Sequence, residues 1–223
     1  MNRKHTALFL LLAAAIATSF GSGTLAQSCS PPAGFIDQPH PTLASPDLLA
    51  AHTEEITVNL PLGMVMAATV KMPLKDAIHK AGDLPGVTGD YPLNTIPFGT
   101  PGARRLVCLS DGSTLEEQVL ELEHTATFNR FRYMVWNYTT KQARPIEYGI
   151  GEFRHSAIDP AHTHIVWTYS FKLKENEFPG NLGAFGRLIF HWVFLDRDYA
   201  AMMRATLHAG NVAAEKQSAE KGK

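Results

Sequence analysis

Apolar and polar residues alternate along much of the second half of the chain, from residue 103 to residue 173. This period of two indicates half-buried β-strands, and it predicts strands over 104–110, 113–123, 128–138, 146–155 and 162–173. Asp111-Gly112, between the first two strands, is a sequence typical of a type I′ hairpin turn. An alternating segment at 52–60 predicts one earlier strand. Short turns between consecutive strands favour an antiparallel meander.

A helical period of three to four residues appears at three places. Residues 62–70 and 74–81 predict two short helices, and residues 182–210 predict one long amphipathic helix. The glycine- and proline-rich segment 82–102 predicts a long loop, and the charged end of the chain predicts a disordered tail over 211–223. This order of elements predicts an α+β fold, in which a curved antiparallel sheet wraps around the long C-terminal helix.

Five short motifs mark turns and strands within the predicted domain, residues 52–210. They are Leu84-Pro85-Gly86-Val87-Thr88-Gly89, Gly99-Thr100-Pro101-Gly102-Ala103-Arg104-Arg105, Leu109-Ser110-Asp111-Gly112-Ser113, Phe131-Arg132-Tyr133 and Trp167-Thr168-Tyr169-Ser170-Phe171. Together they resemble the SRPBCC, or START-like, superfamily, and most closely its polyketide cyclase/dehydrase-like branch. The resemblance implies a helix-grip fold that encloses an elongated, largely apolar cavity for lipids, sterols, polyketides or other hydrophobic molecules.

The first 26 residues have the three-part plan of a secretory signal peptide. Arg3 and Lys4 give a positive start, residues 7–17 form an apolar run, and small residues precede a cleavage point before Gln27. The apolar run is shorter than the roughly 20 residues of a membrane-spanning helix, so we expect cleavage rather than an uncleaved anchor. We therefore expect an exported protein, periplasmic or secreted, with no stable membrane span after signal removal. Residues 27–51 contain five prolines and predict an extended arm.

Composition and cysteine content exclude several classes of protein. The 20 Lys and Arg nearly balance the 21 Asp and Glu, so no strong positive field points to nucleic acid as a partner. The two cysteines, Cys29 and Cys108, are too few for a zinc cluster. In an oxidising compartment they could form a disulfide; otherwise Cys108 is a buried strand residue and Cys29 a free thiol. Hydrolase, P-loop and dinucleotide-binding motifs are absent from the sequence, and we expect neither cofactor nor metal.

Aromatic residues dominate the predicted strands and are the candidates for binding a hydrophobic ligand. Their apolar surface, with a few hydroxyl and indole donors, suits a ligand pocket, although the same residues could simply pack as a core against the last helix. With one histidine of the long helix, the candidate ligand-binding residues are Phe131, Tyr133, Tyr148, Phe153, Trp167, Tyr169, Phe171 and His191.

Three residues are candidates for acid/base catalysis, if the protein is an enzyme. They are Tyr133, His191 and Glu117, and a carboxylate inside an apolar cavity would have a raised pKa and could transfer protons. Simple alternation places Glu117, Glu121 and Glu123 on one face of their strand and Glu116 on the other. The sequence does not tell which face lines the cavity. The alternative is an exposed face whose acids pair with Arg104, Arg105, Arg130 and Arg132 on neighbouring strands.

His162 and His164 share one strand face, as metal ligands could. Because they follow a turn at Asp159-Pro160 and have no evident third ligand, we favour exposed turn histidines. His191 is open to a similar alternative, as a surface residue beside Arg187.

The first functional hypothesis is an exported protein that binds a hydrophobic small molecule or lipid between the sheet and the long helix. The second is a polyketide cyclase/dehydratase-like enzyme that uses acid/base residues in the same cavity. The third is a structural or partner-binding domain whose interior is filled by its own side chains.

Overall fold

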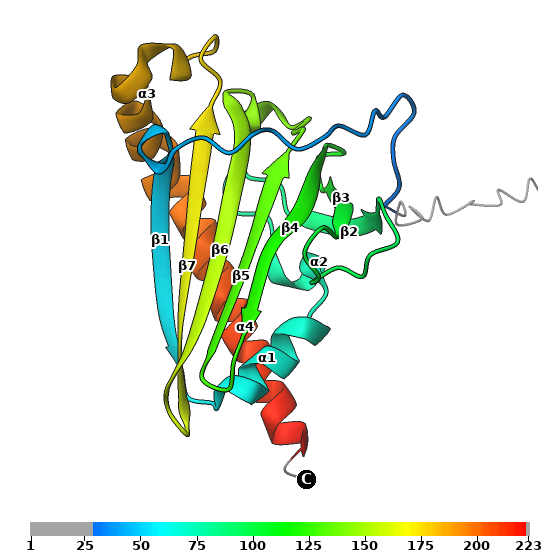
Figure 1. Ribbon diagram of the computed structural model, residues 1–223, viewed down its shortest axis with the longest axis vertical. Coiled ribbons are helices and arrows are strands. Elements are labelled where there is room, and N and C mark those ends of the chain that lie inside the picture. Colours follow the sequence, from blue (N-terminus) through cyan, green and yellow to red (C-terminus); the bar gives the residue numbers. More distant parts are fainter. Residues whose placement is uncertain (1–28, 222–223) are drawn as a thin grey trace, which may run out of the picture.

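The computed structural model describes residues 29–221, and the predicted signal peptide lies outside this range. At its centre is a seven-stranded antiparallel sheet in the order β1-β7-β6-β5-β4-β3-β2 (Figure 1). The strands are β1 (Ala50–Val58), β2 (Val87–Pro92), β3 (Arg104–Leu109), β4 (Thr114–His124), β5 (Phe128–Trp136), β6 (Ile146–Asp159) and β7 (His162–Leu173). Strands β3 to β7 form the predicted meander, and β1 joins its far edge by pairing with β7.

The structure differs from the sequence prediction at two places near the start of the meander. Segment 82–102, expected to be a loop, contains β2, which pairs with β3 across a bulge near Gly89. Its prolines and glycines hide any alternation, and such residues are tolerated at a sheet edge. The hairpin at Asp111-Gly112 is present, but only Gly112 has a positive φ, of 82°. A type I′ turn needs two such residues, so the turn type was wrong.

The C-terminal helix follows one face of the sheet, as predicted, but it has three parts. They are α3 (Gly183–Phe190), the π-helical segment η4 (His191–Tyr199) and α4 (Ala200–Lys221). The expected disordered tail at 211–223 does not agree with α4, which remains helical through Lys221. Ala214 is buried in this last part, because α1 packs against α4.

Shorter helices connect the strands. Helix α1 (Leu62–Lys71) and helix α2 (Leu74–Ala77) follow β1, close to the predicted positions. Three 3₁₀ turns, η1 (Pro46–Leu48), η2 (Lys141–Ala143) and η3 (Gly180–Leu182), lie in connections. Among the helices of the described residues, none is both long enough and apolar enough to cross a membrane.

The proline-rich arm crosses the sheet face opposite α4 (Figure 1). Trp136 Nε1 donates to the Gln38 backbone oxygen at 3.2 Å, and the Tyr148 hydroxyl accepts the Ala44 N–H at 2.6 Å. At the start of the arm, Cys29 forms a disulfide with Cys108 of β3. The arm therefore covers apolar residues of β5 and β6 that would otherwise face water.

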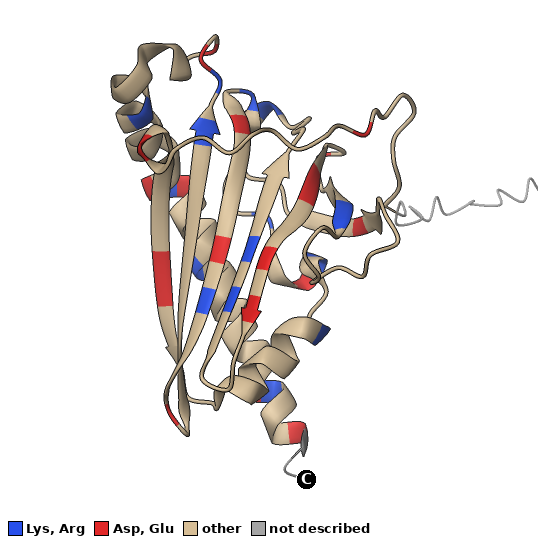
Figure 2. Ribbon diagram, viewed as in Figure 1, with Lys and Arg blue, Asp and Glu red and all other residues tan. Residues whose placement is uncertain are grey.

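Charged residues form a band across the middle of the arm-side face (Figure 2). Glu152 on β6 pairs with Arg130 at 2.8 Å and with Arg154 at 2.6 Å. Glu121 on β4 pairs with Arg130 and Arg132, each at 2.9 Å. The Glu121 contacts match the alternative in which acids of this strand pair with Arg130 and Arg132 on the neighbouring strand, whereas Arg154 lies on the same strand as Glu152.

Candidate functional site

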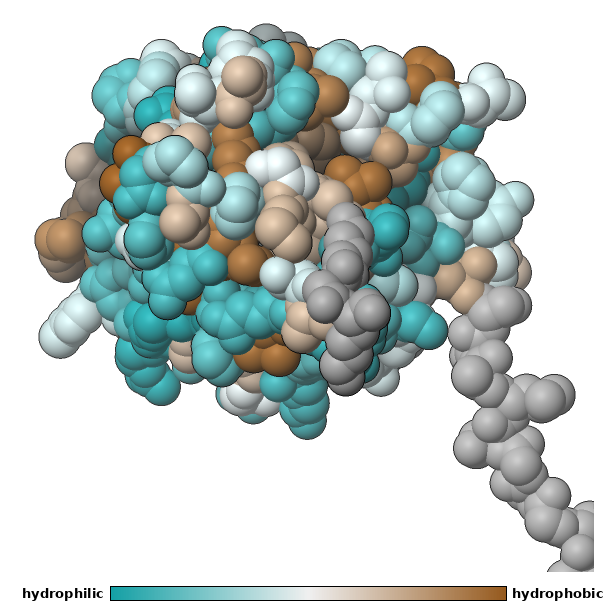
Figure 3. Space-filling model, turned by 90° about the horizontal axis from the view of Figure 1, so that it is seen from below, coloured by the Kyte–Doolittle hydropathy of each residue, from teal (hydrophilic) through white to brown (hydrophobic). Residues whose placement is uncertain are grey.

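A cavity of about 740 Å³ lies between the sheet and the helices α1, α2 and α4. Its volume is within the roughly 300–1,000 Å³ typical of small-molecule sites. Several exposed members of its lining, Val70 of α1, Phe98, and Leu122 and His124 of β4, lie together at one side. The cavity therefore reaches the surface between α1, the 93–102 loop and the end of β4. Figure 3, which views the molecule from the end formed by α1 and the last turns of α4, shows apolar side chains interrupting the hydrophilic surface.

Aromatic rings from three adjacent strands line the cavity wall. Phe153 on β6 stacks with Tyr133 on β5 and with Trp167 on β7, and the Phe153 and Trp167 ring centroids are 4.6 Å apart. Further along β7, Tyr169 stacks on Phe171 at 4.8 Å. These positions alternate along each strand and therefore share the face that looks toward α4.

Two glycines of β6 make room for these rings. Gly151 is directly opposite Tyr133 in the register, and a Cβ added there would lie 2.1 Å from Tyr133 Cζ. A Cβ at Gly149 would lie 2.6 Å from Tyr169 Cε1. The rings thus lie over bare backbone, which holds them against the wall and out of the cavity centre.

An ion pair interrupts the apolar lining. Arg105 Nε donates to Glu117 Oε2 at 2.5 Å, and both side chains are largely buried, at 12% and 7% exposed. The Arg105 guanidinium also lies over the Phe98 ring, 3.5 Å from its centroid, a favourable cation–π geometry. The site therefore offers a fixed pair of opposite charges on its β3–β4 wall.

Four tyrosines add hydroxyl groups to the same space. Burial raises the pKa of Tyr133 well above its ordinary value, and the nearby Glu117 carboxylate raises it further. Burial also raises the pKa of Tyr138, Tyr169 and Tyr199. At neutral pH all four phenols keep their protons, so they can donate hydrogen bonds.

Two buried donors in the cavity wall, the Tyr138 hydroxyl and Trp167 Nε1, make no hydrogen bond of ordinary geometry within residues 29–221. Both residues line the cavity, where the Tyr169 hydroxyl lies near Tyr138 and the Tyr133 hydroxyl lies near Trp167. Unpaired buried polar groups are uncommon in native proteins. These two donors are therefore available to hydrogen-bond a molecule in the cavity.

His155, in the second half of β6, is a further buried polar residue of the cavity lining. His155 is 4% exposed, and its Nδ1 is 3.5 Å from Asn129 Nδ2. Burial lowers its pKa to about 4, so the imidazole is neutral at physiological pH.

The structure brings most of the sequence-predicted residues together. Lining the cavity are Glu117, Phe131, Tyr133, Phe153, Trp167, Tyr169 and Phe171. Tyr148 does not join them, because it lies on the opposite face under the arm with Met134 and Trp136. Tyr148 and Phe153 are five residues apart on one strand, and an odd spacing places them on opposite faces.

His191 also lies outside the cavity. Its Nε2 is 2.9 Å from the Ala51 backbone oxygen and its Nδ1 is 3.0 Å from Asp196 Oδ2, at the edge of the sheet. His191 is therefore not a cavity residue, and its partly exposed side chain agrees with the alternative of a surface histidine.

A bulge in β4 resolves which of its acids face the cavity. Glu117 pairs with Val135 in the register and faces inward. The bulge between Val119 and Glu121 then shifts the alternation by one residue. As a result Glu121 faces the arm side, contrary to the sequence expectation, whereas Leu122 lines the cavity.

Sequence reasoning missed several polar residues of the lining, among them Arg105, Tyr138, His155 and Tyr199. Simple alternation would place Tyr138 on the same face as Trp136. Asn137 between them has a φ of 51°, and this left-handed residue ends the strand and turns Tyr138 toward the cavity. An asparagine after a strand is the only available signal, since asparagine tolerates that conformation.

His162 and His164 do not meet in a metal site. His162 pairs with Asp159 at 2.7 Å, and His164 lies 3.4 Å from Glu55. Both are partly exposed, in agreement with the interpretation as turn histidines.

Several solved structures share this architecture at low sequence identity. Ara h 8.0201 matches over 75% of this chain and 99% of its own, with a TM-score of 0.53 and 17% identity. The Zhui aromatase/cyclase from Streptomyces sp. R1128 matches over 76% and 96%, with a TM-score of 0.52 and 14% identity. A START superfamily protein from Mycobacterium smegmatis matches over 75% and 98%, with a TM-score of 0.51 and 9% identity. No protein-family model and no curated protein matches the sequence. The chain therefore has the helix-grip, START-like fold that the sequence resemblance implied.

Proposed function

We propose that this protein is an exported binding protein that holds a hydrophobic small molecule or lipid between the sheet and α4. The observation that carries the proposal is the cavity of about 740 Å³, whose wall contains the unpaired donors of Tyr138 and Trp167. Burial of apolar ligand surface would supply the driving force. A core filled by its own side chains, the third sequence hypothesis, does not fit this cavity.

The polar groups indicate what the ligand must carry. Tyr138 offers an O–H donor and Trp167 an N–H donor, and neither makes a well-formed hydrogen bond within residues 29–221. A ligand with carbonyl, ether or hydroxyl oxygens on an apolar frame would satisfy them. Two proteins with this fold are an aromatase/cyclase and a START superfamily protein. Their shared fold is compatible with a small-molecule site at this position.

Export is part of the proposal. It is supported by the signal-peptide pattern of residues 1–26 and by the bond between Cys29 and Cys108, because disulfides persist in oxidising compartments and are rare in the cytosol. Expression of the full chain followed by cell fractionation and N-terminal sequencing tests this. A protein that begins near Gln27 outside the cytoplasm is expected, and an uncleaved cytosolic product would contradict export.

The binding test combines ligand recovery with a titration. Native mass spectrometry and organic extraction of the exported protein should recover a bound hydrophobic molecule. After extraction, N-phenyl-1-naphthylamine, an uncharged fluorescent probe, should bind with a one-to-one signal. Leu115→Trp, which fills the cavity, should weaken probe binding at least tenfold.

Leu120→Trp is the matched control. Leu120 is on the same strand but packs against the arm-side cluster, whereas Leu115 lines the cavity. If both variants bind the probe equally well, the probe does not occupy the cavity and the proposal fails.

The enzyme hypothesis is the second candidate, and the Glu117–Arg105 pair beside Tyr133 favours it. A cyclase or dehydratase would use a carboxylate and a phenol to move protons within the cavity. Tyr133→Phe keeps the ring and removes the hydroxyl, so a binding protein should keep its probe affinity within about threefold. A loss of turnover on polyketide-like or aromatic substrates, with unchanged probe binding, would favour the enzyme.

A further inference from the structure

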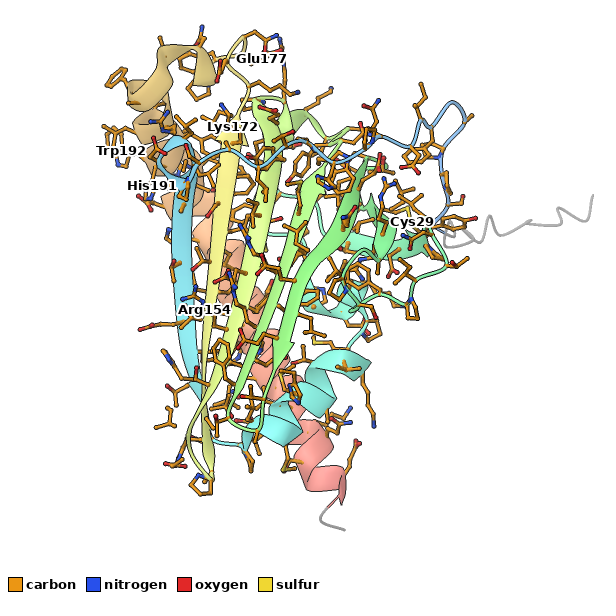
Figure 4. The ribbon with its side chains drawn as sticks, in the orientation of Figure 1. Cys29, Arg154, Lys172, Glu177, His191 and Trp192 are labelled. Carbon is orange, nitrogen blue, oxygen red and sulfur yellow. A yellow bond between two sulfur atoms is a disulfide. The ribbon has the colours of Figure 1, made fainter. Side chains whose placement is uncertain are left out.

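Two histidines and an aspartate meet outside the cavity, at the β1 edge of the sheet. His52 of β1 and His191 and Asp196 of η4 each present one potential ligand atom, and these atoms lie within 4.8 Å of one another. His52 Nδ1 is 3.2 Å from Asp196 Oδ1, and His191 Nδ1 is 3.0 Å from Asp196 Oδ2. Figure 4 shows His191 beside β1 and below α3.

The π-helical segment creates this arrangement. His191 and Asp196 are five residues apart, and on an α-helix the neighbours on one face are three or four residues apart. A π-helix is wider and bonds residues five apart, so η4 (His191–Tyr199) places both side chains on one face. His52 projects from the same side of β1 as the cavity-facing residues, because it is directly opposite Tyr169 in the register. Such π-helical turns are frequent at functional sites.

The ring nitrogens of His52 and His191 have more acceptor partners than two neutral imidazoles have N–H groups to donate. His52 Nε2 is 2.8 Å from Glu54 Oε1, and its Nδ1 faces Asp196. His191 Nε2 is 2.9 Å from the Ala51 backbone oxygen, and its Nδ1 also faces Asp196. All four ring nitrogens therefore face oxygen acceptors, although two neutral imidazoles carry only two N–H groups. The cluster therefore attracts positive charge, either as further protons on the imidazoles or as a bound cation.

We propose that His52, His191 and Asp196 bind a divalent transition-metal ion, with Zn²⁺ as the type case, through both Nδ1 atoms and the Asp196 carboxylate. Zn–N and Zn–O bonds of about 2.0–2.2 Å place tetrahedral ligands about 3.3 Å apart. His191 Nδ1 is 3.0 Å from one oxygen of this carboxylate and His52 Nδ1 is 3.2 Å from the other. Imidazole ligands select Zn²⁺, Co²⁺, Ni²⁺ or Cu²⁺ over Ca²⁺ and Mg²⁺. Three protein ligands leave a coordination position for water or another small ligand.

The groups behind the ligands match those of known metal sites. A metal-bound histidine usually donates its other N–H to a carboxylate or a backbone carbonyl. Here Glu54 takes that place for His52 and the Ala51 carbonyl takes it for His191. Arg204 of α4 holds Glu54 through an ion pair of 2.5 Å. The bound metal would fasten the edge strand β1 to the C-terminal helix.

Metal titration tests the proposal independently of any cavity ligand. The protein, purified without a histidine tag and treated with a chelator, is titrated with ZnCl₂ in a calorimeter. One Zn²⁺ per chain is expected, and Co²⁺ at the same site should give a visible d–d absorption. His191→Ala and Asp196→Asn should weaken binding by roughly a hundredfold or more, and Glu54→Gln, behind the ligand, by roughly 10–100-fold.

His162→Ala is the matched control, because His162 also pairs with an aspartate, Asp159, but no third ligand lies near it among residues 29–221. It should bind Zn²⁺ like the wild type, and retained binding of the cavity probe should show that every variant is folded. Absence of Zn²⁺ and Co²⁺ binding by the wild type would overturn the site. So would unchanged binding by His191→Ala and Asp196→Asn, or an equal loss in His162→Ala.

Discussion

Replacing Gly151 with alanine tests whether the bare backbone of β6 shapes the cavity. The added Cβ would lie 2.1 Å from Cζ, 2.3 Å from Oη and 2.5 Å from Cε1 of Tyr133. Ordinary van der Waals contact begins near 3.4 Å, so the ring must move by about 1.3 Å. The movement is away from the strand and into the cavity.

The size of the effect follows from overpacking. Extra atoms in a well-packed interior cost about 1–3 kcal/mol, and a loss near 2 kcal/mol lowers the Tm of a domain of this size by roughly 4–8 °C. Urea unfolding of the oxidised protein gives the free-energy change. We also expect weaker binding of the cavity probe, since the displaced ring takes up space that the ligand would use.

Two comparisons isolate the cause. Gly63→Ala, in α1 where an added Cβ meets nothing within 4 Å, should stabilise the protein by about 0.5–1 kcal/mol. Tyr133→Val removes the clashing ring, so Gly151→Ala in that background should cost less than about 0.5 kcal/mol. If Gly151→Ala costs the same with and without the Tyr133 ring, the ring does not lie over this glycine and the reasoning is wrong.

Three further predictions concern stability and use chemical denaturation. The Cys29–Cys108 disulfide spans 79 residues, and closing a loop of that length stabilises the folded state by about 4.5 kcal/mol through chain entropy. Replacing both cysteines with alanine should lower the free energy of unfolding by about 2–4 kcal/mol. A loss below about 1 kcal/mol would contradict the entropic account. Burial lowers the pKa of His155 from 6.5 to about 4. As the pH falls between these two values only the unfolded state gains a proton, so the free energy of unfolding should drop by about 3 kcal/mol. In His155→Phe this part of the pH dependence should vanish. Glu117→Gln leaves the Arg105 charge unpaired and should cost about 3–5 kcal/mol, whereas replacing both residues with methionine should cost much less; equal losses would show that the pair is not coupled.

The sheet and its order could be predicted because the signal is local. Strands β5, β6 and β7 begin where the sequence predicts, at Phe128, Ile146 and His162, since their alternation is regular and their turns are short. Most of the aromatic wall follows from the same alternation. Once the strands and the covering helix are predicted, alternation alone identifies the residues of β7 that face the helix.

The remaining site residues depend on local departures from regular geometry. The bulge in β4 moves Glu121 to the arm side, the left-handed Asn137 turns Tyr138 inward, and the π-helical segment brings Asp196 beside His191. Each departure changes which face a side chain occupies, and none has a strong signal in a single sequence. Alternation predicts a face correctly only up to the first irregular residue.

The arm and the disulfide explain why this sheet is apolar on both faces. Met134 and Tyr148 are fully buried on the side away from α4, and an uncovered antiparallel sheet would expose them to water. Contacts from Gln38 and Ala44 cover them, and the bond between Cys29 and Cys108 ties the start of the arm to β3. Reduction should therefore loosen the arm first and expose this face, while the cavity on the other face keeps its walls. A reducing agent that increases proteolysis within residues 29–49 without changing probe binding would show that the two faces are independent, and a parallel loss of probe binding would show that the arm supports the cavity through the sheet.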